Sequence, residues 1–312
     1  MKKFFIMLAA AVTVVSCAKE ETLSFDKGEA IEFGNAFIDN ATRAADKTYS
    51  GDKALTAFNL YGTVTGTNGT INIYNNCNVT GAVGTAVWTC PVSQYWIDGA
   101  NYKFVAIADG TVATKDGNNM PLTITCNTAV DENNVQNDLL YAEATATGKA
   151  SGNSKVNFTF SHLLSKAQFT VKSNTQDGYY YSVKDIKVNN YVNGTYTISG
   201  ATWTGTGVKT DTAFGNIDSV TAADTNGKTC DYQRLLIPTT DDFTVSFTVE
   251  LWNSNGDADV VKLATQNYTK TVSQDLVKGQ AYDFNLSLSV GELIQFTVTE
   301  KPTWANETDV TL

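Results

Sequence analysis

Alternation of apolar and polar side chains is the feature that most constrains how this chain folds. Between Phe243 and Leu251, phenylalanine, valine and leucine occupy the odd positions, and threonine, serine and glutamate the even ones. A period of two predicts a strand with one face in a core and the other in water. Shorter apolar runs recur between turn-forming pairs such as Asn68-Gly69 and Asp98-Gly99. We find no long helical pattern, so the sequence predicts an all-β protein built from antiparallel strands.

The end of the chain repeats this alternation and breaks it once. From Phe284 to Val298 the even positions are mostly apolar and the odd ones mostly polar. The sequence around Gly291-Glu292 interrupts the phase, which predicts two strands, 282–288 and 293–299, joined by a turn or bulge. Because only short, polar sequence follows, we interpret the second strand as a terminal appendage with one apolar face. That face consists of Ile294, Phe296 and Val298, and Leu293 begins the strand.

The beginning of the chain predicts export as a lipoprotein. Lys2 and Lys3 precede a run of about a dozen apolar residues, and small residues then lead to Cys17. The run is shorter than the roughly 20 residues of a membrane span. We therefore expect residues 1–16 to be a signal peptide and Cys17 to carry a lipid. The lipid would attach the chain to the outer membrane after export through the periplasm.

A first strand is expected soon after the lipid. Ile31, Phe33 and Phe37 share one face of the stretch from 30 to 38, which predicts a strand with an apolar side. The next residues, 40–46, are small and polar, as in an exposed loop.

That loop contains Arg43, one of only two arginines in the chain. The other, Arg234, lies in the run 232–238, which we interpret as a strand whose backbone a protease could not reach. An arginine-specific protease would then cut the folded chain once, between Arg43 and Ala44, and would separate the lipid and the first strand from the rest. The alternative is an ordinary loop arginine.

Length and charge limit the classes of function. The chain has 312 residues, enough for two domains of about 130 residues each. We expect a lipidated segment at 17–43, a first sandwich at 44–165, and a second at 166–312 that includes the terminal strand at about 293–312. The formal net charge is −10, and loss of two lysines with the signal peptide makes it −12. So acidic a surface has no basic footprint for nucleic acid.

Residues suited to catalysis or metal binding are few. His162 is the only histidine, and the sequence offers it no triad or ligand cluster. We expect it to be hydrogen-bonded at a junction between two strands. Cys77, Cys90, Cys126 and Cys230 match no zinc spacing. Export permits a disulfide of Cys77 with Cys90 or Cys126, and buried free thiols remain the alternative. We predict no enzyme activity, no metal and no cofactor.

Short blocks of sequence, in order along nearly the whole chain, carry a family resemblance. They are Pro91 to Trp96 running into Tyr102 to Ala106, Asp138 to Ala142, Phe158 to Val171, Leu236 to Pro238, Gly279 to Phe284, and Trp304. In these blocks the chain resembles the fimbrillin family, the pilin-like lipoproteins of the Bacteroidetes that build type V pili. The resemblance implies two tandem transthyretin-like antiparallel β-sandwich domains, cell-surface display, processing by an arginine-specific protease, and polymerisation by exchanged strands.

These observations combine into a prediction of function. A cut at Arg43 that removes the Ile31 to Phe37 strand would leave unpaired backbone groups and an apolar groove. The 293–299 strand of another pilin subunit could fill that groove by strand addition. The contact joins different surfaces head to tail, so it does not close and it yields a filament. The sequence therefore predicts a structural pilus subunit that supports adhesion.

Two alternatives stay open. An uncut anchor or a tip adhesin of the same pili would share the fold without taking part in both halves of the exchange. A surface glycan-binding lipoprotein would instead need an aromatic platform, for which Tyr179 to Tyr181, Trp203 and Trp252 are the candidates.

A turn is also expected within the second half of the chain. The pair Asn193-Gly194 has turn chemistry and lies between a strand at 180–189 and a short stretch at 195–199 that could pair with it. We expect the two stretches to form a hairpin.

Overall fold

The described part of the chain is entirely β-structure. The computed structural model describes residues 28–38, 55–82, 87–149, 151–175, 178–253, 260–289 and 295–301. Within these ranges the chain forms strands β1 to β17 and no helix, which confirms the all-β prediction. Accordingly, no helix among the described residues has the length and apolar character needed to cross a membrane.

The first sheet has six strands in the order β1-β8-β7-β4-β2-β3. They are β1 (Phe33–Ile38), β2 (Ala57–Gly66), β3 (Gly69–Thr80), β4 (Asn101–Ala108), β7 (Leu140–Thr147) and β8 (Val156–His162). Every neighbouring pair is antiparallel except β1 and β8, which are parallel. The sheet surrounds an aromatic core in which Phe58, Phe104, Phe158 and Phe160 are buried.

The rest of the described chain forms two further sheets. One has the order β15-β14-β10-β6-β5 with β11 beside β10, and the other the order β12-β9-β16-β17 with β13 beside β9. Their strands are β5 (Thr111–Lys115), β6 (Pro121–Asn127), β9 (Ser165–Ser173), β10 (Tyr179–Thr197), β11 (Thr202–Val220), β12 (Lys228–Thr229), β13 (Arg234–Leu236), β14 (Phe243–Asn253), β15 (Val261–Val272), β16 (Ala281–Leu288) and β17 (Gln295–Lys301).

The alternation in β14 has the predicted result. Phe243, Val245, Phe247 and Val249 are buried, and the residues between them are half-exposed. These side chains pack against β9 and β16 of the facing sheet in a second core. The two sheets therefore form a sandwich, because each contributes one apolar face to a shared interior.

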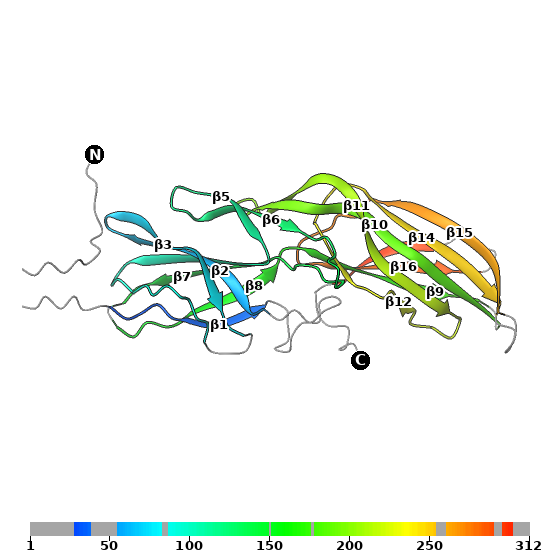
Figure 1. The fold of residues 1–312 in the computed structure, drawn as a ribbon, viewed down its shortest axis with the longest axis horizontal. Helices are drawn as coiled ribbons and strands as arrows, with labels where there is room; N and C mark the ends of the chain where they lie inside the picture. Colours follow the sequence, from blue (N-terminus) through cyan, green and yellow to red (C-terminus); the bar gives the residue numbers. More distant parts are fainter. Residues whose placement is uncertain are drawn as a thin grey trace, which may run out of the picture.

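The two halves of the molecule are joined by strands and by a third core. They lie at opposite ends of an elongated molecule, with β5 and β6 near the middle (Figure 1). β6 comes before β9 in the chain, but it pairs with β10 of the second half. Ile107, Ile124, Leu163 and Ile237 belong to an apolar cluster at this junction. The division at residue 165 and the transthyretin-like strand arrangement stay predictions.

The hairpin expected around Asn193-Gly194 is wrong. β10 continues through both residues to Thr197 and pairs there with β6 and β11. A Cβ atom on Gly194 would lie 2.8 Å from the Ile237 side chain and 3.0 Å from the Trp203 ring. The glycine is needed for this close approach of neighbouring side chains and not for a turn.

Candidate functional site

The first strand occupies one edge of the first sheet. β1 runs parallel to β8, with Phe33 opposite Val156, and the backbone of Phe37 opposite Thr159. The pairing is irregular just after Phe33, where the backbone N–H of Asn35 donates to a side-chain oxygen of β8 instead of to its backbone. On the side that faces β8, β1 is therefore held by parallel strand pairing that is interrupted once.

The other side of the strand is also bonded. Residues 29–33 run beside residues 88–96, which we call the bridging segment. The backbone N–H of Ile31 donates to the carbonyl of Gln94 at 2.8 Å, and that of Trp96 to the carbonyl of Glu29 at 2.9 Å. A third bond, of 3.3 Å, joins Trp88 to the carbonyl of Phe33. The N-terminal part of the strand thus lies between two backbone partners.

The bridging segment links β1 to the opposite edge of the same sheet. Thr89 and Thr80, the last residue of β3, exchange two backbone hydrogen bonds of 2.8 and 3.0 Å. A disulfide between Cys77 and Cys90 joins the same two elements. Backbone bonds therefore pass from β8 through β1 and the bridging segment to β3, and β1 closes the wall around the first core.

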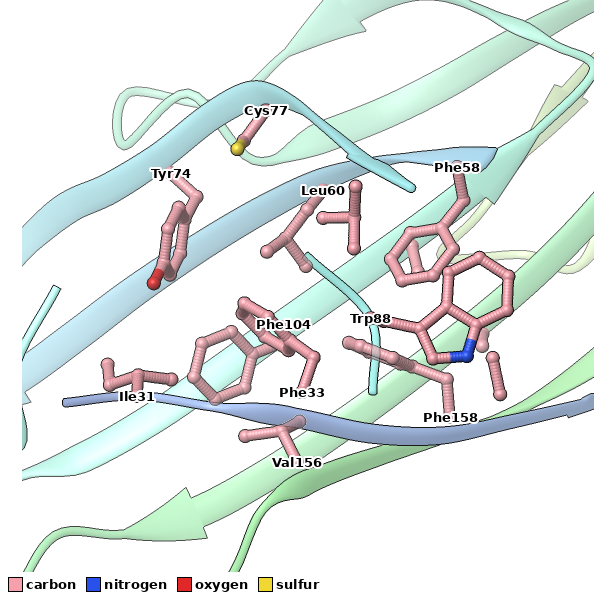
Figure 2. Close-up of a cluster of buried hydrophobic side chains, with 14 of the residues drawn as sticks. Ile31, Phe33, Phe58, Leu60, Tyr74, Cys77, Trp88, Phe104, Val156 and Phe158 are labelled. Atoms are coloured by element: carbon pink, nitrogen blue, oxygen red, sulfur yellow. The ribbon is translucent and has the colours of Figure 1, made fainter. Parts of the chain in front are cut away.

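Side chains from this part of the chain fill the interior of that wall. Ile31 and Phe33 are buried, with exposed fractions of 7% and 3%. The Phe33 ring lies 5.7 Å from the ring of Tyr74 and 6.2 Å from those of Phe104 and Phe158. Figure 2 shows both side chains directed into the cluster. Removal of residues 29–38, which include β1, would therefore leave an apolar groove with unpaired backbone groups on both of its sides.

The last described strand lies on its own subunit. β17 is antiparallel to β16, with Phe296 opposite Leu286 and Val298 opposite Phe284. Phe296 and Val298 are half-buried against the second core, and the Phe296 ring stacks 6.1 Å from that of Phe284. The two strands expected at this end are both present, and the apolar face of the second covers the edge of the second sandwich.

Several residues singled out from the sequence lie outside the described ranges. They are Cys17, Arg43, Ala44, Leu293 and Ile294. Lipidation and processing therefore stay predictions, and so does the first part of the terminal strand.

The comparisons with known proteins decide the family. Residues 42–302 match the family described as fimbrillin-like. The chain belongs to the fimbrillin-like family. No curated protein matches it. As a fimbrillin-like chain, it is a structural protein and not an enzyme.

Solved structures share the fold of this fimbrillin-like chain. A fimbrial protein from Bacteroides vulgatus has a TM-score of 0.64 at 17% identity, over 88% of this chain and 99% of that one. A protein from Bacteroides uniformis, described as a candidate cell adhesion protein, has a TM-score of 0.54 at 21% identity, over 90% of this chain and 100% of that one. At these identities the likeness concerns the fold.

The second arginine of this fimbrillin-like chain is buried. Arg234 lies in β13 with an exposed fraction of 1%. Its Nε donates to the carbonyl of Ala213 at 2.7 Å, and its Nη2 to Oδ1 of Asn134 at 2.6 Å. The guanidinium also lies 4.4 Å from the ring centre of Tyr232. Burial lowers the pKa of Arg234. The interpretation as a protected strand arginine is confirmed.

The single histidine has a structural hydrogen bond. Nδ1 of His162 lies 2.7 Å from Oδ2 of Asp138, and both side chains are buried. His162 ends β8 opposite Leu140 of β7, next to the junction core. No group of three or more metal-ligating side chains occurs among the described residues.

The aromatic residues considered for a sugar platform do not assemble into one. Tyr180 and Trp252 stack in parallel at 6.1 Å on neighbouring strands. Trp203 instead donates its indole N–H to the carbonyl of Leu163 at 2.7 Å and packs against the junction core. Trp203 therefore takes no part in the Tyr180–Trp252 pair, and the glycan-binding alternative stays a prediction that rests on that half-buried pair.

The cysteines divide into one disulfide and two buried thiols. Cys77 pairs with Cys90, and Cys126 and Cys230 are free. Burial raises the pKa of Cys126 to about 12 and that of Cys230 to about 11. A raised thiol pKa lowers the fraction of reactive thiolate at a given pH.

We expect both free thiols to resist alkylation in the folded chain. At pH 8, the shifts imply about a thousandfold less thiolate at Cys126 and about a hundredfold less at Cys230 than in the unfolded chain. Iodoacetamide labelling with and without urea, followed by mass spectrometry of the two peptides, measures this. Equal labelling rates in both conditions would contradict the burial of these side chains.

The bridging segment carries buried residues that the alternation pattern does not reveal. Its contacts with β1 and β3 are isolated bridges instead of a regular strand. Trp88 and Trp96 are nevertheless buried. Two tryptophans on either side of a cysteine were the available signal, because such large apolar residues mark where a loop packs on a core.

Proposed function

We propose that this fimbrillin-like chain is a structural pilus subunit that supports adhesion. It is exported as a lipoprotein lipidated at Cys17, displayed on the outer membrane, and cut after Arg43 by an arginine-specific protease. It then polymerises head to tail when the terminal strand of the next subunit replaces β1. Family membership and the fold shared with the fimbrial protein of Bacteroides vulgatus support this proposal.

One observation carries it: a strand that fills the first core precedes the proposed cut. Ile31 and Phe33 are buried, and Arg43 lies between β1 and β2 in the sequence. After cleavage, β1 would be held only by non-covalent contacts. Burial of an apolar side chain contributes roughly 1.5–3 kcal/mol, and each backbone hydrogen bond about 0.5–1.5 kcal/mol. The vacated groove therefore favours any strand that supplies the same groups.

The terminal strand has the right pattern to do so. Phe296 and Val298 are two residues apart on one face of β17. Ile31 and Phe33, at the start of the first strand, have the same spacing. β17 lies on β16 in the single chain, so donation requires it to exchange one strand partner for another. An extended strand can make that exchange because its hydrogen bonds to any sheet edge are of the same kind.

Digestion of the purified, folded chain with an arginine-specific protease tests the proposal. We expect a single cut that gives a new N-terminus at Ala44, an intact bond after the buried Arg234, and a ladder of detergent-resistant multimers on a gel. The matched control is Arg43→Lys, which keeps the charge and removes the site, and which should stay uncut and monomeric. A chain that is cut at Arg43, loses residues 1–43 and remains monomeric would refute the proposal.

A further inference from the structure

The bridging segment has two independent sets of contacts. One set is with residues 29–33, at the start of the first strand, through the backbone bonds of Glu29, Ile31 and Phe33 described above. The other set is with parts of the first sheet that remain after a cut at Arg43. It comprises the backbone pair of Thr80 and Thr89 and the Cys77–Cys90 disulfide. Loss of residues 29–38, which include β1, removes the first set and leaves the second.

Two tryptophans near the ends of the segment pack against the first core. The Trp88 ring lies 5.2 Å from that of Phe58, and the Trp96 ring 4.6 Å from that of Tyr102. A Cβ atom on Gly81 would lie 2.5 Å from the Trp88 ring, so the glycine leaves room for it. These rings belong to the core that the departing strand exposes.

The part between the tryptophans has little apolar anchorage of its own. Pro91 and Ser93 are exposed, and the side chain of Val92 is 46% exposed. A segment with few buried contacts opens easily once its backbone partners leave. The disulfide at Cys90 is the covalent tie in this stretch, and a disulfide limits the open conformations that such a segment can adopt.

We infer that the bridging segment, fastened by the Cys77–Cys90 disulfide, is the second wall of the groove that accepts a strand from another copy of this chain. This inference rests on the proposed function. The incoming strand bonds to β8 on one side and to the backbone of Trp88, Gln94 and Trp96 on the other. A strand bonded on both sides has its register set twice, so its apolar residues must fall where Ile31 and Phe33 lie.

A buried donor in this wall supports its role as a site for an exchangeable strand. The indole Nε1 of Trp88 is buried, and none of the described residues, those of β1 included, accepts a hydrogen bond from it. A buried donor without an acceptor destabilises the structure that contains it. The resident strand supplies no acceptor to this group, and an incoming strand with an acceptor at that position would satisfy it.

The test compares the wild-type chain with the double variant Cys77→Ala/Cys90→Ala. The matched control is Cys126→Ala, which removes a buried sulfur and keeps the disulfide. A second arm reduces and alkylates the folded wild-type chain, so that the result does not depend on the variant folding from the start. Each chain is cut at Arg43, and its rate of multimer formation is measured.

Amide hydrogen exchange provides a readout that does not depend on assembly. After residues 1–43 are removed, we expect the amides of Thr80 and Thr89 to stay protected in the wild type. In the disulfide-free chains they should exchange at least tenfold faster. Before the cut, all chains should show similar protection there, because β1 holds the segment.

The outcomes separate the two proposals. We expect multimers to form at least tenfold more slowly without the disulfide, and the amides of Trp88 and Trp96 to be protected in wild-type multimers. Equal assembly rates, or free exchange at those tryptophans in the multimer, would overturn the inference. If the cut wild-type chain never assembles, the proposed function is wrong. In that case the exchange of the Thr80 and Thr89 amides still tests whether the disulfide holds the bridging segment: protection in the wild type alone supports this role, and equal exchange in all chains contradicts it.

Discussion

Phe33→Ala is expected to lower the free energy of unfolding of the uncut chain by about 3–5 kcal/mol and to leave the cut, assembled chain unchanged. Phe33 is 3% exposed and packs against three aromatic rings. Its truncation leaves a cavity in the first core as long as β1 is present. If assembly replaces β1, the residue is no longer part of the protein, and its identity cannot affect stability.

The matched control for this prediction is Phe158→Ala. Phe158 lines the same cluster, as Figure 2 shows, but it belongs to β8 and remains after the cut. The substitution Phe158→Ala should therefore destabilise both the uncut chain and the multimer. Urea unfolding of the uncut chains and thermal unfolding of the multimers measure both effects. Multimers destabilised by Phe33→Ala as much as by Phe158→Ala would show that the first strand is never replaced.

Phe296→Asp combined with Val298→Asp is expected to weaken assembly by roughly 10²- to 10⁴-fold. Loss of two buried apolar side chains costs about 3–6 kcal/mol, and each 1.4 kcal/mol is about a tenfold change in affinity. In the single chain the two residues are only half-buried against the second core. The monomer should therefore lose less stability than the contact between subunits.

Thr297→Asp combined with Thr299→Asp is the control for the terminal strand. These residues alternate with the apolar pair and are exposed on the other face of β17. The two substitutions add the same charge as the first double variant without removing apolar contacts, so assembly should change little. Multimer yield after cleavage at Arg43, followed over a range of protein concentrations, measures both variants. If the two double variants are equally impaired, the apolar face of the terminal strand is not what the neighbouring subunit binds.

The strands that alternation predicted are those whose environment is uniform along their length. β14 has one face in the second core throughout, so its odd residues are buried and the pattern can be recognised from the sequence. The pair β16 and β17 was recognised for the same reason. Gly194 shows where local patterns fail, because the same dipeptide suits a turn or a crowded strand. Its environment is set by Ile237 and Trp203, which no local pattern connects to it.

The sequence by itself determined the class of fold and the apolar faces of the first and last strands. It also showed that the chain has only two arginines, Arg43 in a polar stretch and Arg234 in an apolar one. These follow from periodicity and composition, which act residue by residue. Only the tertiary structure decided that β1 lies between β8 and the bridging segment, and that the Cys77–Cys90 disulfide ties that segment to β3. Pairings between distant strands depend on which edges remain open once all the others have paired, and a linear pattern of side chains does not contain that information.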